Sequence, residues 1–349
     1  DSTNMVSEFK KTGSVVLPCF EWIYEDPELV EIINDSYGMY DYHTRQIDGR
    51  SNLGWCRTMY HSVVQQLVRG DVMYWLYYAI LRQKTNFVSY PYYTKFAKPG
   101  DNTFFRHIDL NISESVYSGR GADTIQGSVS FNEEDNKNCT EVLLGFHNII
   151  NKYQEWRAKK GIADSTGYIE GWEDRVDWPA ECQQLFPEVQ WTKQPCEAGQ
   201  VRISDPRLPH GSTGPATIER RTMLPWYVLV NEDMSTMEIP EMGTYADIAA
   251  AHQALTAAPK SPSGHANKYG GIDWPFPGVT NPVFTSEISK AIHCQVRWDS
   301  PTVLSELSFY FTDLGGQISK DSITKFINTT RAATVAVSYT HLTLPTTPY

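Results

Sequence analysis

A series of short strand-like segments between residues 86 and 230 constrains the fold of this chain more than any other feature. These segments are rich in β-branched and aromatic residues, and turn sequences such as Lys-Pro-Gly-Asp-Asn at 98–102 separate them. The candidates are residues 86–96, 103–112, 124–132, 140–146, 200–204 and 221–230. Because they do not alternate regularly with helical patterns, they favour an antiparallel barrel or jelly roll over a doubly wound parallel sheet.

Helical patterns lie on both sides of the strand-like segments and between them. A further strand is expected near the start of the chain, at 13–24. Helices are expected at residues 27–36, 55–83, 148–160 and 245–257, with a break in the second near Gly70 and Asp71. The predicted fold class is therefore mainly β with flanking helices.

The chain of 349 residues is long enough for one large domain with appended elements or for two ordinary domains. We expect residues 1–235 to form the β domain, with a helical N-terminal part and an insertion at 148–195. Residues 236–337 hold one predicted helix and a loop rich in Pro, Gly and Ser, and are expected to form an appended C-terminal subdomain. Residues 338–349 carry no Asp, Glu, Lys or Arg and no amphipathic period, which predicts a non-native or disordered tail.

Charge and composition limit the kinds of binding partner that we expect for this chain. The formal net charge is −11, and long Lys/Arg clusters are missing, which argues against nucleic acid as a partner unless the fold assembles a local basic groove. No apolar run approaches 18 residues, so we expect no membrane span. The six cysteines form no Cys-x-x-Cys pair and are expected to be free thiols in the cytoplasm. The sequence does not set an oligomeric state.

A metal-ligand pattern lies in the segment Thr-Phe-Phe-Arg-His-Ile-Asp-Leu-Asn-Ile at 103–112. In a strand, His107 and Asp109 point to the same face, so imidazole and carboxylate converge. A non-haem iron(II) site takes two imidazoles and one carboxylate on one face, so a second histidine must come from elsewhere. His210, which ends the strand-turn unit beginning at Gly199, is the best candidate. The alternatives are a strand histidine hydrogen-bonded to a carboxylate and an ordinary turn histidine.

Two arginines follow this histidine. Arg220 and Arg221 lie ten and eleven residues after His210, at the start of the strand-like segment 221–230. An arginine inside a barrel needs a carboxylate partner, which a dicarboxylate such as 2-oxoglutarate would supply through a bidentate salt bridge. The alternative is a solvated basic pair beside Glu219.

Three stretches resemble a known family. Residues 199–228, Gly-Gln-Val-Arg-Ile-Ser-Asp-Pro-Arg-Leu-Pro-His-Gly-Ser and onward, resemble the end of the phytanoyl-CoA dioxygenase-like branch of the Fe(II)/2-oxoglutarate-dependent oxygenases. There a Gly-Asp/Gln strand leads into His-Gly-Ser, with an arginine about eleven residues after the histidine. Residues 128–148 resemble the family's acidic loop and following strand, although Phe146 replaces the usual Ser before His147. Residues 13–20 resemble its N-terminal strand.

The resemblance implies a double-stranded β-helix core of jelly-roll or cupin type. It also implies iron(II), 2-oxoglutarate and dioxygen as cofactor and cosubstrates, with His107, Asp109 and His210 as metal ligands. Which arginine holds 2-oxoglutarate stays open at this point. Counting forward from His210 favours Arg221. Counting back from Tyr227, or matching an Arg-x-Ser/Thr pattern, favours Arg220. The two side chains point to opposite faces, so only one can serve.

The activity that the resemblance implies is hydroxylation or desaturation of a small organic metabolite, with formation of succinate and carbon dioxide. The presence of Asp109 fits this outcome, because related halogenases have a small residue there. One alternative is the same chemistry on a modified nucleobase or a protein side chain. Another is a non-catalytic metal-binding jelly-roll module. By their strand positions, Tyr92, Thr103 and Gln126 are expected to flank the metal.

Overall fold

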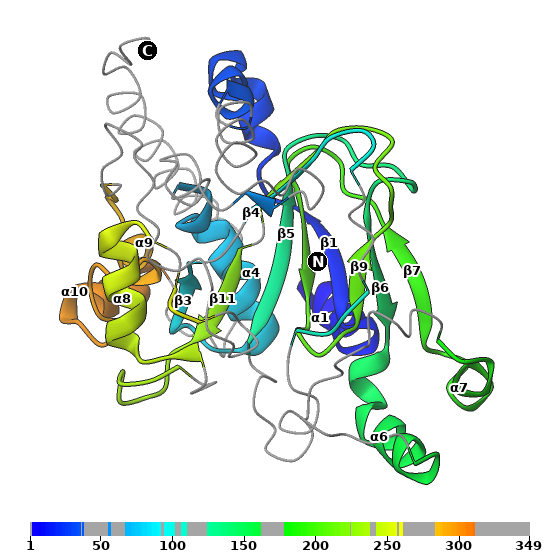
Figure 1. Ribbon diagram of the computed structural model, residues 1–349. Coiled ribbons are helices and arrows are strands. Elements are labelled where there is room, and N and C mark those ends of the chain that lie inside the picture. The colour runs from blue at the N-terminus through cyan, green and yellow to red at the C-terminus, as the bar shows by residue number, and fades with distance from the viewer. Residues whose placement is uncertain are drawn as a thin grey trace. The chain divides into compact units, whose positions relative to one another are not determined.

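The structure of the chain is a computed structural model (Figure 1). It describes residues 2–35, 37, 55–56, 67–91, 94–101, 106–109, 124–161, 178–223, 225–237, 242–256, 258–260 and 283–310. The chain forms two compact units: unit 1 consists of Asp1–Cys56 and Thr94–Leu224, and unit 2 of Arg57–Tyr93 and Pro225–Tyr349. The expected boundary at residue 235 remains a prediction, and the predicted tail at 338–349 lies outside the described residues.

Unit 1 is built from two antiparallel sheets (Figure 1). Its larger sheet has the order β1-β8-β5-β10-β4-β2, and its smaller sheet the order β7-β6-β9. The larger sheet comprises β1 (Ser14–Pro18), β2 (Trp55–Cys56), β4 (Thr94–Ala97), β5 (Ile125–Ser130), β8 (Gln200–Ser204) and β10 (Arg220–Met223). The smaller comprises β6 (Thr140–Leu144), β7 (Gln190–Gln194) and β9 (His210–Ser212). Each of these pairings is antiparallel.

The chain passes repeatedly between the two sheets. It runs from β5 in the larger sheet to β6 and β7 in the smaller, returns to β8, crosses to β9 and comes back to β10. This alternation of antiparallel strands between two facing sheets is the winding of a double-stranded β-helix, or jelly roll. The predicted fold class, mainly β with flanking helices and a jelly-roll core, is confirmed.

One glycine fixes the entry to β8. Gly199 has a φ of +88°, and a Cβ built there would lie 2.6 Å from the backbone nitrogen of Glu21. Its carbonyl oxygen also accepts a 2.8 Å hydrogen bond from the backbone N–H of Phe20. Only glycine combines this left-handed conformation with such close packing of two backbones. The turn thereby sets the register in which β8 pairs with β1.

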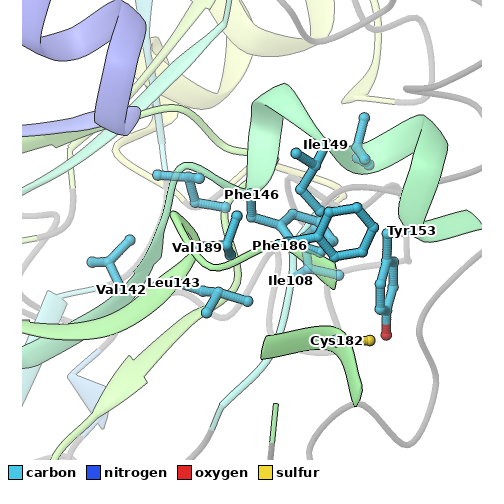
Figure 2. Packing of buried hydrophobic residues seen from close by; sticks show 11 residues of the cluster. Ile108, Val142, Leu143, Phe146, Ile149, Tyr153, Cys182, Phe186 and Val189 are labelled. Carbon is cyan, nitrogen blue, oxygen red and sulfur yellow. The ribbon is translucent and has the colours of Figure 1, made fainter. Parts of the chain in front are cut away.

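A hydrophobic cluster packs behind the smaller sheet (Figure 2). Phe146 is fully buried at its centre and makes edge-to-face contact with Tyr153 of α6 (Ile150–Lys159) at a ring separation of 5.1 Å. Cys182 of α7 (Ala180–Leu185) and Ile108 belong to the same cluster. Because Ile108 lies between His107 and Asp109 in the sequence, its burial holds that tripeptide against the hydrophobic core.

Unit 2 combines helices with one pair of strands. It contains α4 (Val72–Arg82), β3 (Phe87–Tyr90), β11 (Trp226–Leu229), α8 (Tyr245–Ala254), α9 (Glu287–Ile292) and α10 (Pro301–Tyr310). β3 and β11 pair antiparallel, and Asp71 caps α4 by accepting hydrogen bonds from the backbone N–H groups of Met73 and Tyr74. Among the described residues, no helix is long and apolar enough to cross a membrane.

Several predicted elements differ from the structure at their ends. Segments 86–96 and 221–230 were expected as single strands, but each divides at a proline, Pro91 or Pro225, because proline cannot donate a ladder hydrogen bond. The helix expected at 55–83 is wrong at its start, since Trp55–Cys56 pairs with β4 as strand β2. The N-terminal helix α1 (Ser2–Thr12) was not predicted. In unit 1, the strand expected at 13–24 ends at Pro18 and is followed by η1 (Glu21–Glu25).

Candidate metal centre

Three side chains with metal-ligating atoms converge in unit 1. His107 Nε2 lies 3.1 Å from Asp109 Oδ1, and His210 Nε2 lies 3.2 Å from Asp109 Oδ2. One ligand atom from each residue can be chosen so that all three lie within 4.8 Å of one another. Among the described residues this is the one group of three or more His, Cys, Asp or Glu with such spacing.

The backbone places the two histidines opposite each other. His107 and His210 form an antiparallel bridge, in which each backbone N–H donates a 2.8 Å hydrogen bond to the carbonyl oxygen of the other residue. Directly opposed residues of an antiparallel pair project their side chains to the same face, so both imidazoles leave the backbone on one side. The side chain of Ile108 lies in the hydrophobic cluster, consistent with strand alternation.

The tautomer of His210 follows from its hydrogen bonds. Its Nδ1 lies 3.0 Å from the carbonyl oxygen of Leu208, which can only accept, so Nδ1 must carry the hydrogen. In the neutral ring, Nε2 therefore presents a lone pair toward the Asp109 carboxylate. A backbone carbonyl in this position is the usual outer partner of a metal-binding histidine.

The electrostatics of the triad call for a cation at its centre. Burial lowers the pKa of His210, with a further contribution from His107, and this favours the neutral ring. Burial raises the pKa of Asp109, but its interactions with the facing imidazoles, that of His107 first, outweigh burial and hold that pKa far below its ordinary value. A neutral imidazole and an ionised carboxylate that face each other are two acceptors, and a metal ion between them satisfies both. Two imidazole nitrogens and one carboxylate on one face are the donor set of non-haem iron(II).

Gln126 of β5 lies beside the triad. Its amide nitrogen is 3.2 Å from His210 Nε2, and its buried amide oxygen has no hydrogen-bond partner among the described residues. This fits the expectation that Gln126 flanks the metal. Tyr92 and Thr103, expected there as well, lie outside the described residues.

The two candidate arginines point in opposite directions. Arg220 is 2% exposed and points between the sheets, where its Nη1 donates to Ser212 Oγ at 3.0 Å and its Nη2 to Thr140 Oγ1 at 2.7 Å. Arg221 is half-buried, and its guanidinium bonds to Glu219 and Asn34. Of the pair, Arg220 is thus the one inside the jelly roll, and Arg221 is an outward-facing basic residue.

Arg220 lies at a definite level relative to the triad. Ser212 follows His210 by two residues on β9, and Thr140 pairs with Ser212 on β6. Two residues along a strand span about 7 Å, so the Arg220 guanidinium lies roughly one such step from the metal-ligating histidine.

Two buried charged residues near Arg220 were not predicted from the sequence. The Glu134 side chain is fully buried, with Oε1 2.8 Å from Arg220 Nε and Oε2 accepting from the backbone N–H of Cys196 at 3.1 Å. Arg202 of β8 is 3% exposed, and its Nε and Nη1 have no hydrogen-bond partner among the described residues. One signal was available, because Arg202 is a charged residue between Val201 and Ile203 in a strand-like segment.

His147, which follows Phe146 in the segment that resembles the family, lies in η3 (Phe146–Asn148). Its Nε2 lies 3.0 Å from the backbone carbonyl oxygen of Lys10 in α1. The ring also lies under Gly13, where an added Cβ would come within 2.7 Å of Nδ1. These contacts attach the N-terminal helix to the smaller sheet.

No protein-family model and no curated protein sequence matches the chain. Solved structures with a similar chain course include EctD from S. alaskensis with bound Fe, at 15% identity and a TM-score of 0.45, covering 66% of this chain and 77% of that one. Another is the non-heme alpha ketoglutarate dependent epimerase SnoN from nogalamycin biosynthesis, at 10% identity and a TM-score of 0.41, covering 66% and 83%. A third is AviO1 from Streptomyces viridochromogenes Tue57, at 15% identity and a TM-score of 0.42, covering 65% and 94%.

Proposed function

We propose that this protein is an Fe(II)- and 2-oxoglutarate-dependent dioxygenase of the phytanoyl-CoA dioxygenase-like branch, acting on a small organic metabolite. One observation carries the proposal: a buried arginine lies one two-residue step from a His-Asp-His triad, between the same two sheets. A metal triad alone fits many activities. The triad together with a buried guanidinium fits a cosubstrate that has a chelating 2-oxo acid at one end and a carboxylate at the other.

In this proposal each residue has a stated task. His107, Asp109 and His210 would hold iron(II) through two imidazole nitrogens and one carboxylate. Arg220 binds the distal carboxylate, with the hydroxyl groups of Ser212 and Thr140 holding its guanidinium in place. Iron held there would supply the activation of dioxygen that accompanies decarboxylation of 2-oxoglutarate to succinate and carbon dioxide.

Two further features support the choice of reaction and substrate. Asp109 provides the carboxylate ligand, so no coordination position is left for a halide, and hydroxylation or desaturation is the expected outcome. The net charge of −11 supports a small molecule over a nucleic acid as substrate.

The experiment is an anaerobic titration with iron(II) and 2-oxoglutarate. We expect a metal-to-ligand charge-transfer band in the visible spectrum, lost in His107→Ala and kept in His147→Gln, which removes a histidine from the same unit but not from the triad. No band in the wild-type protein, or an equal band in His107→Ala, would overturn the proposal. Succinate release in the presence of candidate metabolites then identifies the substrate.

A further inference from the structure

Among the described residues, the groups around Arg202 and Arg220 between the two sheets of unit 1 carry an unbalanced positive charge, counted apart from the metal-ligating triad. Arg202 and Arg220 are both buried there, and Glu134 is the one carboxylate among the charged groups that interact with Arg202. Two thiols, Cys139 and Cys196, lie near the same groups, but burial raises the pKa of both, that of Cys196 to about 12, so they stay neutral. Two guanidinium groups and one carboxylate leave a charge of +1.

This excess charge belongs to Arg202. Glu134 is already engaged, through one oxygen with Arg220 and through the other with the backbone N–H of Cys196. Arg202 Nε and Nη1 are buried without a hydrogen-bond partner among the described residues. Folded proteins rarely bury an unpaired charge, because its desolvation is expensive unless a counter-ion arrives.

Strand alternation directs Arg202 toward the smaller sheet. Ser204, two residues along β8, has its hydroxyl 2.9 Å from that of Ser14, and Ser14 in turn donates to Gln194 of β7 in the smaller sheet. Arg202 shares the face of β8 that Ser204 occupies. Its Cα pairs with Ser128 of β5, whose hydroxyl is also buried without a hydrogen-bond partner among the described residues.

Arg202 also lies at the same level as Arg220 relative to the triad. Ser128 follows Gln126, which contacts His210, by two residues on β5, so Arg202 branches about 7 Å from the triad on the larger sheet. The guanidinium of Arg220 lies one two-residue step from the triad on the smaller sheet. A single carboxylate at this level lies within reach of both arginines and brings the local charge to zero.

We propose that Arg202 is a second cationic anchor for the cosubstrate, binding the distal carboxylate of 2-oxoglutarate together with Arg220. This inference rests on the proposed function. Glu134 then orients Arg220 without neutralising Arg202, and the carboxylate is held between two guanidinium groups and the nearby hydroxyl of Ser128. Arg202 thus strengthens the preference for a dicarboxylate that Arg220 already gives the site.

The first test measures anion binding without the metal. Glutarate has the five-carbon chain and both carboxylates but lacks the keto group, and its binding to the metal-free protein is followed by calorimetry. We expect Arg202→Gln to raise the Kd of glutarate by roughly 10- to 100-fold, the loss of a charge-assisted contact. The matched control is Arg221→Gln. Arg221 is the chain neighbour of Arg220 and faces outward, so this variant should change the Kd of glutarate less than twofold.

A second measurement separates binding from damage to the fold. Because Arg202 is a buried charge whose Nε and Nη1 have no hydrogen-bond partner among the described residues, Arg202→Met should raise the melting temperature of the ligand-free protein. The same variant should lose the thermal stabilisation that glutarate gives to the wild type. A lower melting temperature together with unchanged stabilisation by glutarate would overturn the inference.

A third measurement distinguishes the source of the carboxylate. With iron(II) bound anaerobically, Arg202→Gln should weaken the binding of 2-oxoglutarate. It should not weaken the binding of 2-oxopentanoate, which lacks the distal carboxylate. If 2-oxoglutarate affinity is unchanged and only the KM of the primary substrate rises, Arg202 binds the substrate and the inference fails while the proposed function stands. If the wild type shows no metal-dependent binding of 2-oxoglutarate, the proposed function fails, whatever glutarate does.

Discussion

Replacing Glu134 with glutamine tests the buried charge network with a side chain of nearly the same shape. One carboxylate oxygen becomes an NH₂ group, and the negative charge is lost. The two carboxylate oxygens of Glu134 accept from different donors, Arg220 Nε at 2.8 Å and the backbone N–H of Cys196 at 3.1 Å. Glutamine has one acceptor oxygen, so in Glu134→Gln its NH₂ group must face one of these two donors. The variant also removes the carboxylate that interacts with both buried guanidinium groups among the described residues.

The expected loss follows from these contacts. A hydrogen bond between charged groups contributes about 1.5–3 kcal/mol, and a buried donor left without an acceptor costs about 1–3 kcal/mol. Together they predict that Glu134→Gln lowers the free energy of unfolding by about 3–5 kcal/mol, the range found when one partner of a buried ion pair is removed. Arg220 keeps its bonds to Ser212 and Thr140, which limits the loss.

Urea unfolding followed by circular dichroism measures this difference, with Glu133→Gln as control. Glu133 is the exposed neighbour in the same loop, so its substitution should change the free energy by less than 0.5 kcal/mol. Glutarate should stabilise Glu134→Gln more than the wild type, because the ligand then supplies the carboxylate that the two buried guanidinium groups have lost. A destabilisation below about 1 kcal/mol would refute the assignment of Glu134 as the partner of Arg220.

Three further changes have defined outcomes. Arg220→Gln should raise the Kd of 2-oxoglutarate by roughly 10- to 100-fold, whereas Arg221→Gln leaves it unchanged; equal effects would contradict the orientation of the pair. Phe146→Ala should lower the free energy of unfolding by about 3–5 kcal/mol, because the ring is fully buried, whereas Leu185→Ala, at a position 54% exposed, should have little effect in the same denaturation assay. Burial lowers the pKa of His252 to about 4, so between pH 6.5 and 4 the folded protein binds fewer protons than the unfolded chain. Stability should then fall by up to roughly 1.4 kcal/mol per pH unit on acidification, and His252→Gln should flatten the dependence of the urea midpoint on pH.

The strands that sequence reasoning located well are those whose side-chain pattern is local. Residues 200–204 were expected as a strand and form β8, and residues 140–146 contain β6. The side-chain pattern does not predict a strand that forms only because it pairs with a distant segment. Trp55 and Cys56 pair with β4, which nothing in their own sequence indicates. The helix α1 was missed although Met5 and Phe9 have helical spacing.

The candidate site shows the same division. The spacing of His107 and Asp109 placed both on one face of a strand, and the structure brings His210 to them; their role as ligands remains the proposal above. Choosing between Arg220 and Arg221 required knowing which of these two side chains of β10 points between the sheets. Glu134 and Arg202 escaped prediction because charge balance in a buried space is a property of residues far apart in the sequence.

The tripeptide His107-Ile108-Asp109 contributes both to the candidate metal centre and to the hydrophobic cluster. Its outer residues belong to the candidate metal centre, while Ile108 is part of the hydrophobic cluster around Phe146 (Figure 2). Interiors packed this densely transmit a change of volume to their neighbours. Evolution of this chain toward a new substrate therefore cannot vary the cluster and the metal geometry independently, and compensating pairs of substitutions should be found between Ile108 and the residues that pack on it.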